Sequence, residues 1–224
     1  MSTVVVYDAN VLYPSTLRDV LIRVGLARLV KPKWTERILD EVFQNLHANR
    51  PDLDPARLDR TRGLMNDAIR DVTVTGYDHL INQLELPDPD DRYVLASAIH
   101  TEAQMIVTRN LRDFPSERLR MWGIEAQHPD DFLTKLHQDR PDALGGIVAV
   151  IAVARGDGAG PGEVLDRLAI DAPGTADLIR QTVEDHDWSP LSSSSTPSTR
   201  REGIASRSSD WTRQKPPSET TKPW

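Results

Sequence analysis

The sequence contains no cysteine, few aromatic residues and no long apolar run. Without cysteine the chain cannot form disulfides, a thiolate metal site or a cysteine nucleophile, so a bound metal ion would need oxygen or imidazole ligands. The longest uninterrupted apolar stretch covers residues 147–154, far short of the roughly 20 residues that a membrane helix needs. The first residues also lack the charged region and apolar core of a signal peptide. We therefore expect a cytoplasmic protein without membrane association.

Acidic residues outnumber basic ones, and the 224-residue chain carries a formal net charge of -7. This balance argues against a protein that coats RNA with a basic surface. Residues 189–224 hold six basic and three acidic residues, so the rest of the chain is more acidic than the whole. An acidic body can still act on nucleic acid if its carboxylates cluster around divalent cations, because a bound cation reverses the local sign of charge.

Apolar, β-branched segments alternate with helix-like segments over the first 128 residues. Runs of apolar residues without alternation predict buried strands at 3–7, 72–74, 105–107 and 124–126. Apolar residues at helical spacing predict helices at 19–30, 36–47, from 54 onward, 78–84, from 90 or 91 to 103, and 115–121. Pro32 is expected to end the first helix and Thr35 to cap the second, while Pro87 and Pro89 place 86–90 in a loop. The alternation predicts an α/β fold, a three-layer α/β/α sandwich with a central parallel sheet.

After residue 128 the pattern changes to helices alone. These helices are expected at 129–137, 143–154, 163–170 and 176–185. From residue 189 the sequence is rich in Ser, Thr and Pro and offers hardly an apolar side chain to bury, which predicts disorder. We therefore expect a domain at 1–136, a small all-helical extension at 137–188 and a disordered tail at 189–224.

Four acidic residues stand at the edges of apolar segments: Asp8, Glu41, Asp91 and Asp113. Two of them follow expected strands, and the carboxyl ends of parallel strands are where ligands bind in sheets of this kind. Hard divalent cations prefer oxygen ligands, and a carboxylate at the end of a central strand needs a cation or hydrogen-bond donors. Such a set is typical of a metal-dependent phosphodiesterase, in which cations neutralise phosphate charge. We therefore interpret the chain as a nuclease.

Alternatives exist at each of these positions. Asp113, like Thr108 and Asn110 beside it, can act as a turn or cap residue instead of a metal ligand. Asp8 can cap the helix that follows it instead of binding a cation. Asp40 competes with Glu41 by composition, and Glu41 has only a mild advantage because it borders the apolar face of its helix. Asp90 can cap the helix that Asp91 would open.

Polar and basic neighbours of these acids are candidates for supporting roles. Asn10 can orient Asp8 or cap the following turn, and Thr108 and Asn110 can complete a metal shell or act as turn residues. Four basic side chains are candidate contacts for an RNA backbone: Arg109, Arg112, Lys31 and Lys33.

Four blocks, YDANVL, ILDEV, DPDDRYVLASAI and IVTRNLRDFP, resemble the signature blocks of PIN-domain ribonucleases, in the branch of the VapC toxins. The resemblance covers residues 3–135 in the same order and spacing. It implies a PIN-like α/β/α fold, an endoribonuclease activity that depends on Mg²⁺ or Mn²⁺, and a cognate antitoxin as partner. Members of the family often form homodimers, so a second copy of the chain is a further candidate partner.

The resemblance also bears on the acidic positions. Asp8, Glu41 and Asp91 match the acidic metal ligands of the family, which favours Glu41 over Asp40 and Asp91 over Asp90. Asn110 stands where the family often has Asp, so Asp113 is the only carboxylate of that block, and one fewer charge should weaken a second cation site.

Two other functions are compatible with the sequence. Asn110 and the acidic body would also suit an RNA- or partner-binding module with a degenerate site. A divalent-dependent phosphatase acting on small molecules is less well supported, because Asn10 stands where aspartyl-phosphate enzymes have a second aspartate.

Overall fold

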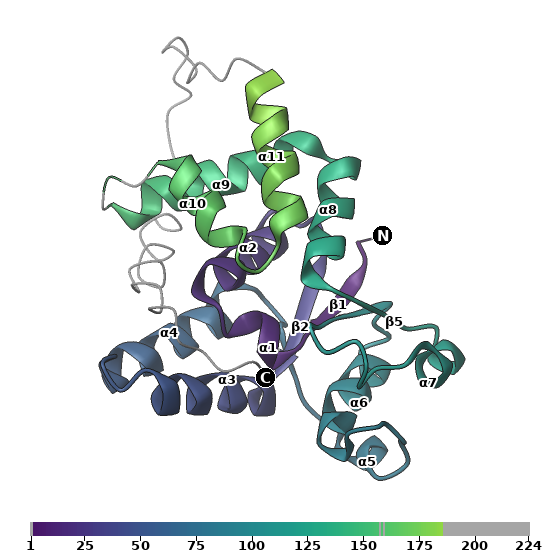
Figure 1. Cartoon of the computed structure of the whole chain (residues 1–224). Coiled ribbons are helices and arrows are strands. Elements are labelled where there is room, and N and C mark those ends of the chain that lie inside the picture. The colour runs from purple at the N-terminus through teal and green to yellow at the C-terminus, as the bar shows by residue number, and fades with distance from the viewer. Residues whose placement is uncertain (1, 157, 159, 186–224) are drawn as a thin grey trace.

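The computed structural model describes residues 2–156, 158 and 160–185, which fold around a five-stranded parallel sheet (Figure 1). The strands lie in the order β3-β2-β1-β4-β5. Their bounds are Val4–Tyr7 for β1, Lys31–Thr35 for β2, Thr73–Val74 for β3, Met105–Val107 for β4 and Glu125–Gln127 for β5. The expected fold class is confirmed, and so are the four strands that the sequence predicted. The tail at 189–224 lies outside the described residues.

Strand β1 separates the two halves of the sheet. The chain first adds β2 and β3 on one side of β1, and later adds β4 and β5 on the other. Tyr7 at the end of β1 lies opposite Val107 at the end of β4, and the next residue, Asp8, donates its backbone N–H to the Val107 carbonyl at 3.1 Å. This switch point between β1 and β4 is where open α/β sheets bind ligands.

Helices cover both faces of the sheet, with α2 on one face and α6 on the other (Figure 1). The helices of the first part of the chain are α1 (Ala9–Leu12), α2 (Ser15–Leu26), α3 (Glu36–Asn49), α4 (Pro55–Ala68), α5 (Asp78–Ile81), α6 (Arg92–His100) and α7 (Ser116–Leu119). Two 3-10 turns, η1 (Pro89–Asp91) and η2 (Arg120–Trp122), precede α6 and follow α7. No helix among the described residues is long and apolar enough to span a bilayer.

Helix α3 begins where the sequence predicts it. The Thr35 hydroxyl accepts a hydrogen bond from the backbone N–H of Ile38 at 3.0 Å, which satisfies one of the unpaired donors of the first turn. The apolar side of α3 is buried: Ile38, Leu39, Val42, Phe43 and Leu46. This burial fixes the rotation of the helix and therefore the direction in which Glu41, at the border of the apolar side, leaves it.

Strand β2 is absent from the sequence-based expectation, because Pro32 was interpreted as a helix stop. Residues alternate their N–H direction along a strand, and here the N–H of Lys31 points to β1 while that of Trp34 points toward the β3 side, bonding to Thr3 and Val72 carbonyls. The Pro32 nitrogen therefore faces the β3 side, where β3 pairs only from Trp34 onward. Proline removes no ladder hydrogen bond at this position, so it is tolerated inside a strand.

Helix α2 lies four residues earlier than the expected helix at 19–30. It starts at Ser15 and ends in a Schellman motif, in which Leu29 N–H bonds to the Val24 carbonyl at 3.1 Å and Arg28 N–H to the Gly25 carbonyl at 2.9 Å. The left-handed residue of this motif is Arg28, with φ of 58°, where glycine is usual. Without glycine, the helix end carries no signal in the sequence, so Leu29 and Val30 were assigned to the helix.

The all-helical extension packs on α2 (Figure 1). The helical extension comprises the helices after residue 128: α8 (Pro129–Asp139), α9 (Pro141–Arg155), α10 (Pro161–Leu168) and α11 (Pro173–Asp185). Their bounds are close to the predicted ones, and α8 spans the boundary expected at residue 136. Phe132 of α8 contacts the buried Tyr7 ring edge to face, with centroids 6.2 Å apart, and Arg155 of α9 donates to the Thr16 hydroxyl of α2 at 2.8 Å. The apolar side chains of the extension continue the core of the sheet.

Candidate active site

Asp8 is buried at the carboxyl end of β1 and uses both carboxylate oxygens. Oδ1 accepts a hydrogen bond from the backbone N–H of Ala9 at 2.7 Å, so Asp8 does cap the short helix α1. Oδ2 accepts from the Asn10 amide at 2.6 Å and from the Thr108 hydroxyl at 2.7 Å. Capping therefore accounts for one oxygen only, and the other accepts from Asn10 in α1 and from Thr108, which follows β4.

The Thr108 hydroxyl joins the ends of β1 and β4. Its oxygen accepts hydrogen bonds from the Asn10 amide and from the backbone N–H of Asn110, both at 3.0 Å. Since a hydroxyl has one proton and these contacts leave it free, the proton points to Asp8 Oδ2. This geometry keeps Asp8 Oδ2 an acceptor and fixes the plane of its carboxylate.

The Asn10 side chain holds the same junction. Its Nδ2 donates to Asp8 and to Thr108, and its Oδ1 accepts from the backbone N–H of Arg109 at 3.0 Å. The N–H of Arg109 can only donate, so the orientation of the Asn10 amide is determined. Between the two roles left open by the sequence, orienting Asp8 is the one for which the structure shows contacts.

Asp91 lies close enough to the other carboxylates for their charges to change its pKa. Burial, together with the charges of Asp8, Asp113, Asp88 and Glu41, raises the pKa of Asp91 to about 7. The pKa of Asp8 is raised to about 6, because burial and the charge of Glu41 outweigh the hydrogen bond from Thr108, which lowers it. These shifts mark a place where four expected site acids gather and repel one another.

Glu41 enters the site from α3 and meets α6. Its Oε2 accepts a hydrogen bond from the Tyr93 hydroxyl at 2.7 Å. The Arg37 guanidinium lies 4.2 Å from the centre of the Tyr93 ring, and burial with the neighbouring Glu41 raises the pKa of the phenol. Asp40 faces elsewhere, where it accepts from Arg62 at 2.6 Å. The two acids that composition could not separate thus lie in different surroundings.

Asn110 fixes the fourth acidic position. Its side-chain amide donates to Asp113, and its backbone carbonyl accepts from the Asp113 N–H at 3.1 Å. The neutral residue that departs from the expected pattern therefore serves to hold the remaining carboxylate. In the preceding loop, Asp88 caps the 3-10 turn by accepting from the Asp90 N–H at 2.8 Å, while Asp90 is exposed.

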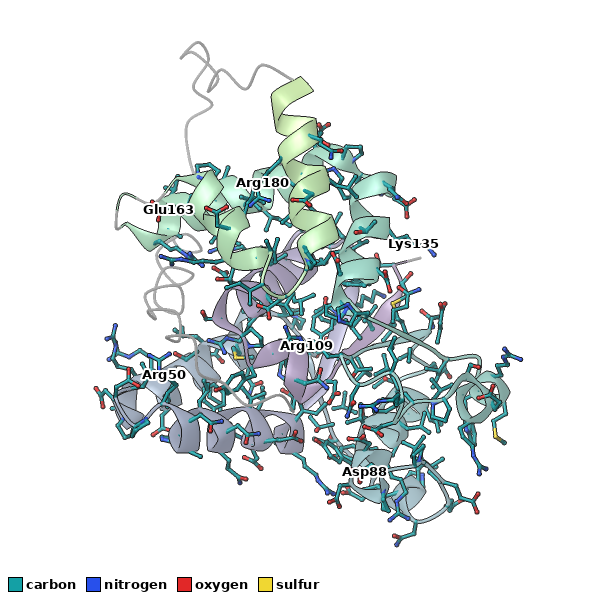
Figure 2. The ribbon with its side chains drawn as sticks, viewed as in Figure 1. Arg50, Asp88, Arg109, Lys135, Glu163 and Arg180 are labelled. Carbon is teal, nitrogen blue, oxygen red and sulfur yellow. The ribbon has the colours of Figure 1, made fainter. Side chains whose placement is uncertain are left out.

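The structure does not bring all the basic candidates to the acidic cluster. Lys31 lies opposite Val4 at the amino-terminal start of the sheet, and Lys33 donates to the Asp71 carbonyl. Because strand β2 was not predicted, the positions of the two lysines along it were not predicted either. Arg112 is exposed on the loop that carries Asn110 and Asp113. Arg109 lies at the centre of the molecule (Figure 2) and forms an ion pair with Asp171 of the helical extension.

The donor set fits a hard divalent cation by its chemistry. Carboxylates from the end of β1, from α3, from η1 and from the loop after β4 supply oxygen ligands. A cation would offset the burial and the mutual repulsion that raise the pKa of Asp8 and Asp91. Within the described part of the chain, however, no three acidic or histidine side chains already lie close enough to enclose a metal ion. The carboxylates would have to draw together around the cation.

Two residues of the site region escaped the sequence reasoning. Tyr93 was assigned only to a helix that packs on the sheet, although its position two residues after Asp91 offered a weak signal. Asp171 lies 62 residues from its partner Arg109 in a different part of the fold. A single sequence carries no signal for such a pair.

Comparison with known proteins gives two matches. Residues 4–112 match the PIN domain family. A segment of 43 residues is 54% identical to a protein of Mycobacterium tuberculosis named "Putative ribonuclease VapC50". That segment covers 19% of this chain and 25% of the relative, so the likeness extends over about a quarter of the relative's length. No solved structure matches the chain.

Proposed function

Residues 4–112 of this chain belong to the PIN domain family, and from that premise we propose that the chain is a divalent-metal-dependent endoribonuclease. The observation that carries the proposal is the gathering of Asp8, Glu41, Asp91 and Asp113 at the switch point of the sheet. Asp8 and Asp91 have pKa values raised to about 6 and about 7 there. Crowded carboxylates weaken a fold unless they serve a ligand, and a divalent cation is the ligand that matches them.

The four carboxylates would hold Mg²⁺ or Mn²⁺, which supplies a water of lowered pKa and stabilises charge on the phosphate oxygens. The residues of the chain prepare the site for this ion. Thr108 and Asn10 fix the plane of the Asp8 carboxylate, and Asn110 fixes Asp113. Tyr93 holds Glu41 by one oxygen. The chain needs no nucleophile of its own, because water attacks the phosphodiester directly.

The neighbouring acids Glu41 and Asp40 provide a matched test. Glu41→Gln keeps an acceptor for Tyr93 but removes the charge, whereas Asp40→Asn removes the charge of an exposed acid that pairs with Arg62. With purified full-length chain, labelled RNA and Mn²⁺, we expect Glu41→Gln to lower the cleavage rate by about a hundredfold or more. Asp40→Asn should cleave like the parent. Equal rates for the two variants, or full activity of Asp8→Asn, would refute the assignment.

We further propose that the chain is the toxin of a toxin–antitoxin pair. The support is the identity of one segment to a relative whose name includes ribonuclease and VapC. Expression of the chain should then arrest growth, and Asp8→Asn should relieve the arrest at equal protein level. Co-expression of a protein encoded by the adjacent gene should relieve it too. Arrest that persists in Asp8→Asn would show that toxicity does not come from cleavage.

An RNA- or partner-binding module without catalysis is the second candidate function. It is favoured by the lack of a preformed metal-binding trio among the described residues and by the neutral Asn110. Titration of Mn²⁺ separates the two functions. A chain that binds RNA but neither binds Mn²⁺ nor cleaves RNA would be such a module.

A further inference from the structure

Asp171 lies in the turn between α10 and α11 and pairs with Arg109, which follows Thr108 of the acidic site. The two side chains differ in exposure: that of Asp171 is 8% exposed and that of Arg109 is 30% exposed. The acid is thus buried in the extension, whereas part of the guanidinium reaches solvent. Figure 2 shows Arg109 between the helical extension and the sheet.

The extension holds Asp171 from both sides. Its backbone N–H donates to the Leu168 carbonyl at 3.0 Å, at the end of α10. On the other side, the Asp130 carboxylate of α8 accepts from the backbone N–H groups of Gly174 and Thr175 at 2.9 and 2.7 Å, and so caps α11. These contacts hold the turn that carries Asp171, so the Arg109 side chain that pairs with it is held in place as well.

The backbone of Arg109 contacts the acidic site, and its side chain contacts the helical extension. Its N–H donates to Asn10 Oδ1, and the Nδ2 group of the same amide donates to Asp8. Among the described residues, Asp171 is the one acceptor of its guanidinium, contacted through Nη2. A guanidinium has five N–H donors in a rigid fork, so the others remain available to a second anion.

The ion pair also directs the charge of Arg109. An arginine beside a cluster of carboxylates would otherwise pair with one of them. Here its guanidinium pairs with Asp171 of the extension instead. Among the described residues, no site carboxylate forms an ion pair with Arg109, whose backbone N–H stays bonded to Asn10.

We propose that Asp171 is a positioning residue that holds Arg109 so that its remaining N–H groups bind a phosphate of an RNA strand at the acidic site. This inference rests on the proposed function, since RNA is the ligand. It makes the helical extension, which lies beyond the matched residues 4–112, a working part of the site. Arginine suits this role because its fork matches phosphate oxygens.

Removal of the Asp171 charge separates positioning from simple electrostatics. Loss of an acid near bound RNA should strengthen binding if only net charge matters. If Asp171 positions Arg109, Asp171→Asn should instead weaken binding, by about tenfold, the value expected for one hydrogen bond to a charged group. Arg109→Ala should have the same effect, and the double variant should be no weaker than Arg109→Ala alone.

The experiment uses a fluorescent single-stranded RNA oligonucleotide of mixed sequence and full-length Asp8→Asn chain, which holds the RNA uncleaved. Binding is measured by anisotropy over a range of salt. Asp171→Asn and Arg109→Ala should each reduce the salt slope by about 0.7, the value for one phosphate contact on a single strand. Asp166→Asn is the matched control, because this exposed acid of the extension also accepts from an arginine, Arg180. It should bind RNA like the parent.

Arg109→Lys provides a second variant that keeps Asp171 paired, should Asp171→Asn not fold. It should weaken binding as well, because an ammonium bound to Asp171 has no fork for phosphate. Unchanged or tighter binding by Asp171→Asn, with a lowered melting temperature alone, would overturn the inference and leave the nuclease untouched. Weakened binding without any cleavage by the parent would support it and refute the nuclease. A parent that does not bind RNA would refute both.

Discussion

Replacement of Asp91 by asparagine should stabilise the protein while abolishing its function. The pKa of Asp91 is about 7 in the folded chain against an ordinary value of 3.8. Its ionised form is therefore disfavoured by folding. The penalty is absent below about pH 4, grows between about pH 4 and about pH 7, and is complete above that. Allowing for solvent around a half-exposed carboxylate, the penalty is about 1 to 2 kcal/mol at pH 8.

Urea unfolding of parent and Asp91→Asn at about pH 5 and about pH 8 measures this penalty. We expect the variant to gain about 1 to 2 kcal/mol over the parent at the higher pH and to lose most of that gain at the lower. Asp90→Asn is the matched control, since Asp90 is an exposed acid of the same 3-10 turn. Equal stability of Asp91→Asn and parent at both pH values would refute the idea that burial and the neighbouring acids disfavour the charged form of Asp91.

Three further substitutions test other contacts of the site and the extension. Thr108→Val should cost about 2 kcal/mol in chemical unfolding, because Asp8 loses a donor and two N–H groups lose their acceptor, whereas Thr108→Ser should remain near the parent. Tyr93→Phe should lower RNA cleavage about tenfold by releasing Glu41, and an unchanged rate would show that the phenol does not matter. Asp130→Ala should cost about 1 to 2 kcal/mol by uncapping α11, with the exposed Asp131→Ala as a near-neutral control.

The parts of the fold that the sequence predicted have strong local signals. Strand β1 is a run of buried apolar residues, and α3 combines an apolar side with a capping Thr35. Strand β2 was not predicted, because proline normally interrupts regular secondary structure. Pro32 removes no ladder hydrogen bond here only because β3 is short and pairs with β2 from Trp34 onward. The predicted end of α2 was wrong, because Arg28 takes a left-handed conformation that glycine usually adopts.

The residues of the candidate site likewise divide into those with a local sequence signal and those without one. Asp8 and Asp91 could be selected because each stands at the border of an apolar segment, and parallel topology brings such borders together. Lys31 and Lys33 were predicted to contact RNA at the acidic site, and this prediction was made without knowledge of the strand on which they lie. The partnership of Arg109 and Asp171 depends on how the extension folds back on α2, which is a property of tertiary packing and not of any local pattern.

Calorimetric titration of Mn²⁺ into the full-length chain near neutral pH is the most direct test of the central claim, that the acidic cluster is a cation site. Asp8 and Asp91 have pKa values of about 6 and about 7, so cation binding should release protons, seen as a heat that varies with the ionisation enthalpy of the buffer. We expect saturable binding with proton release in the parent and in Asp90→Asn, and a clear loss of affinity in Asp91→Asn. No binding by the parent, or equal binding by parent and Asp91→Asn, would contradict the claim.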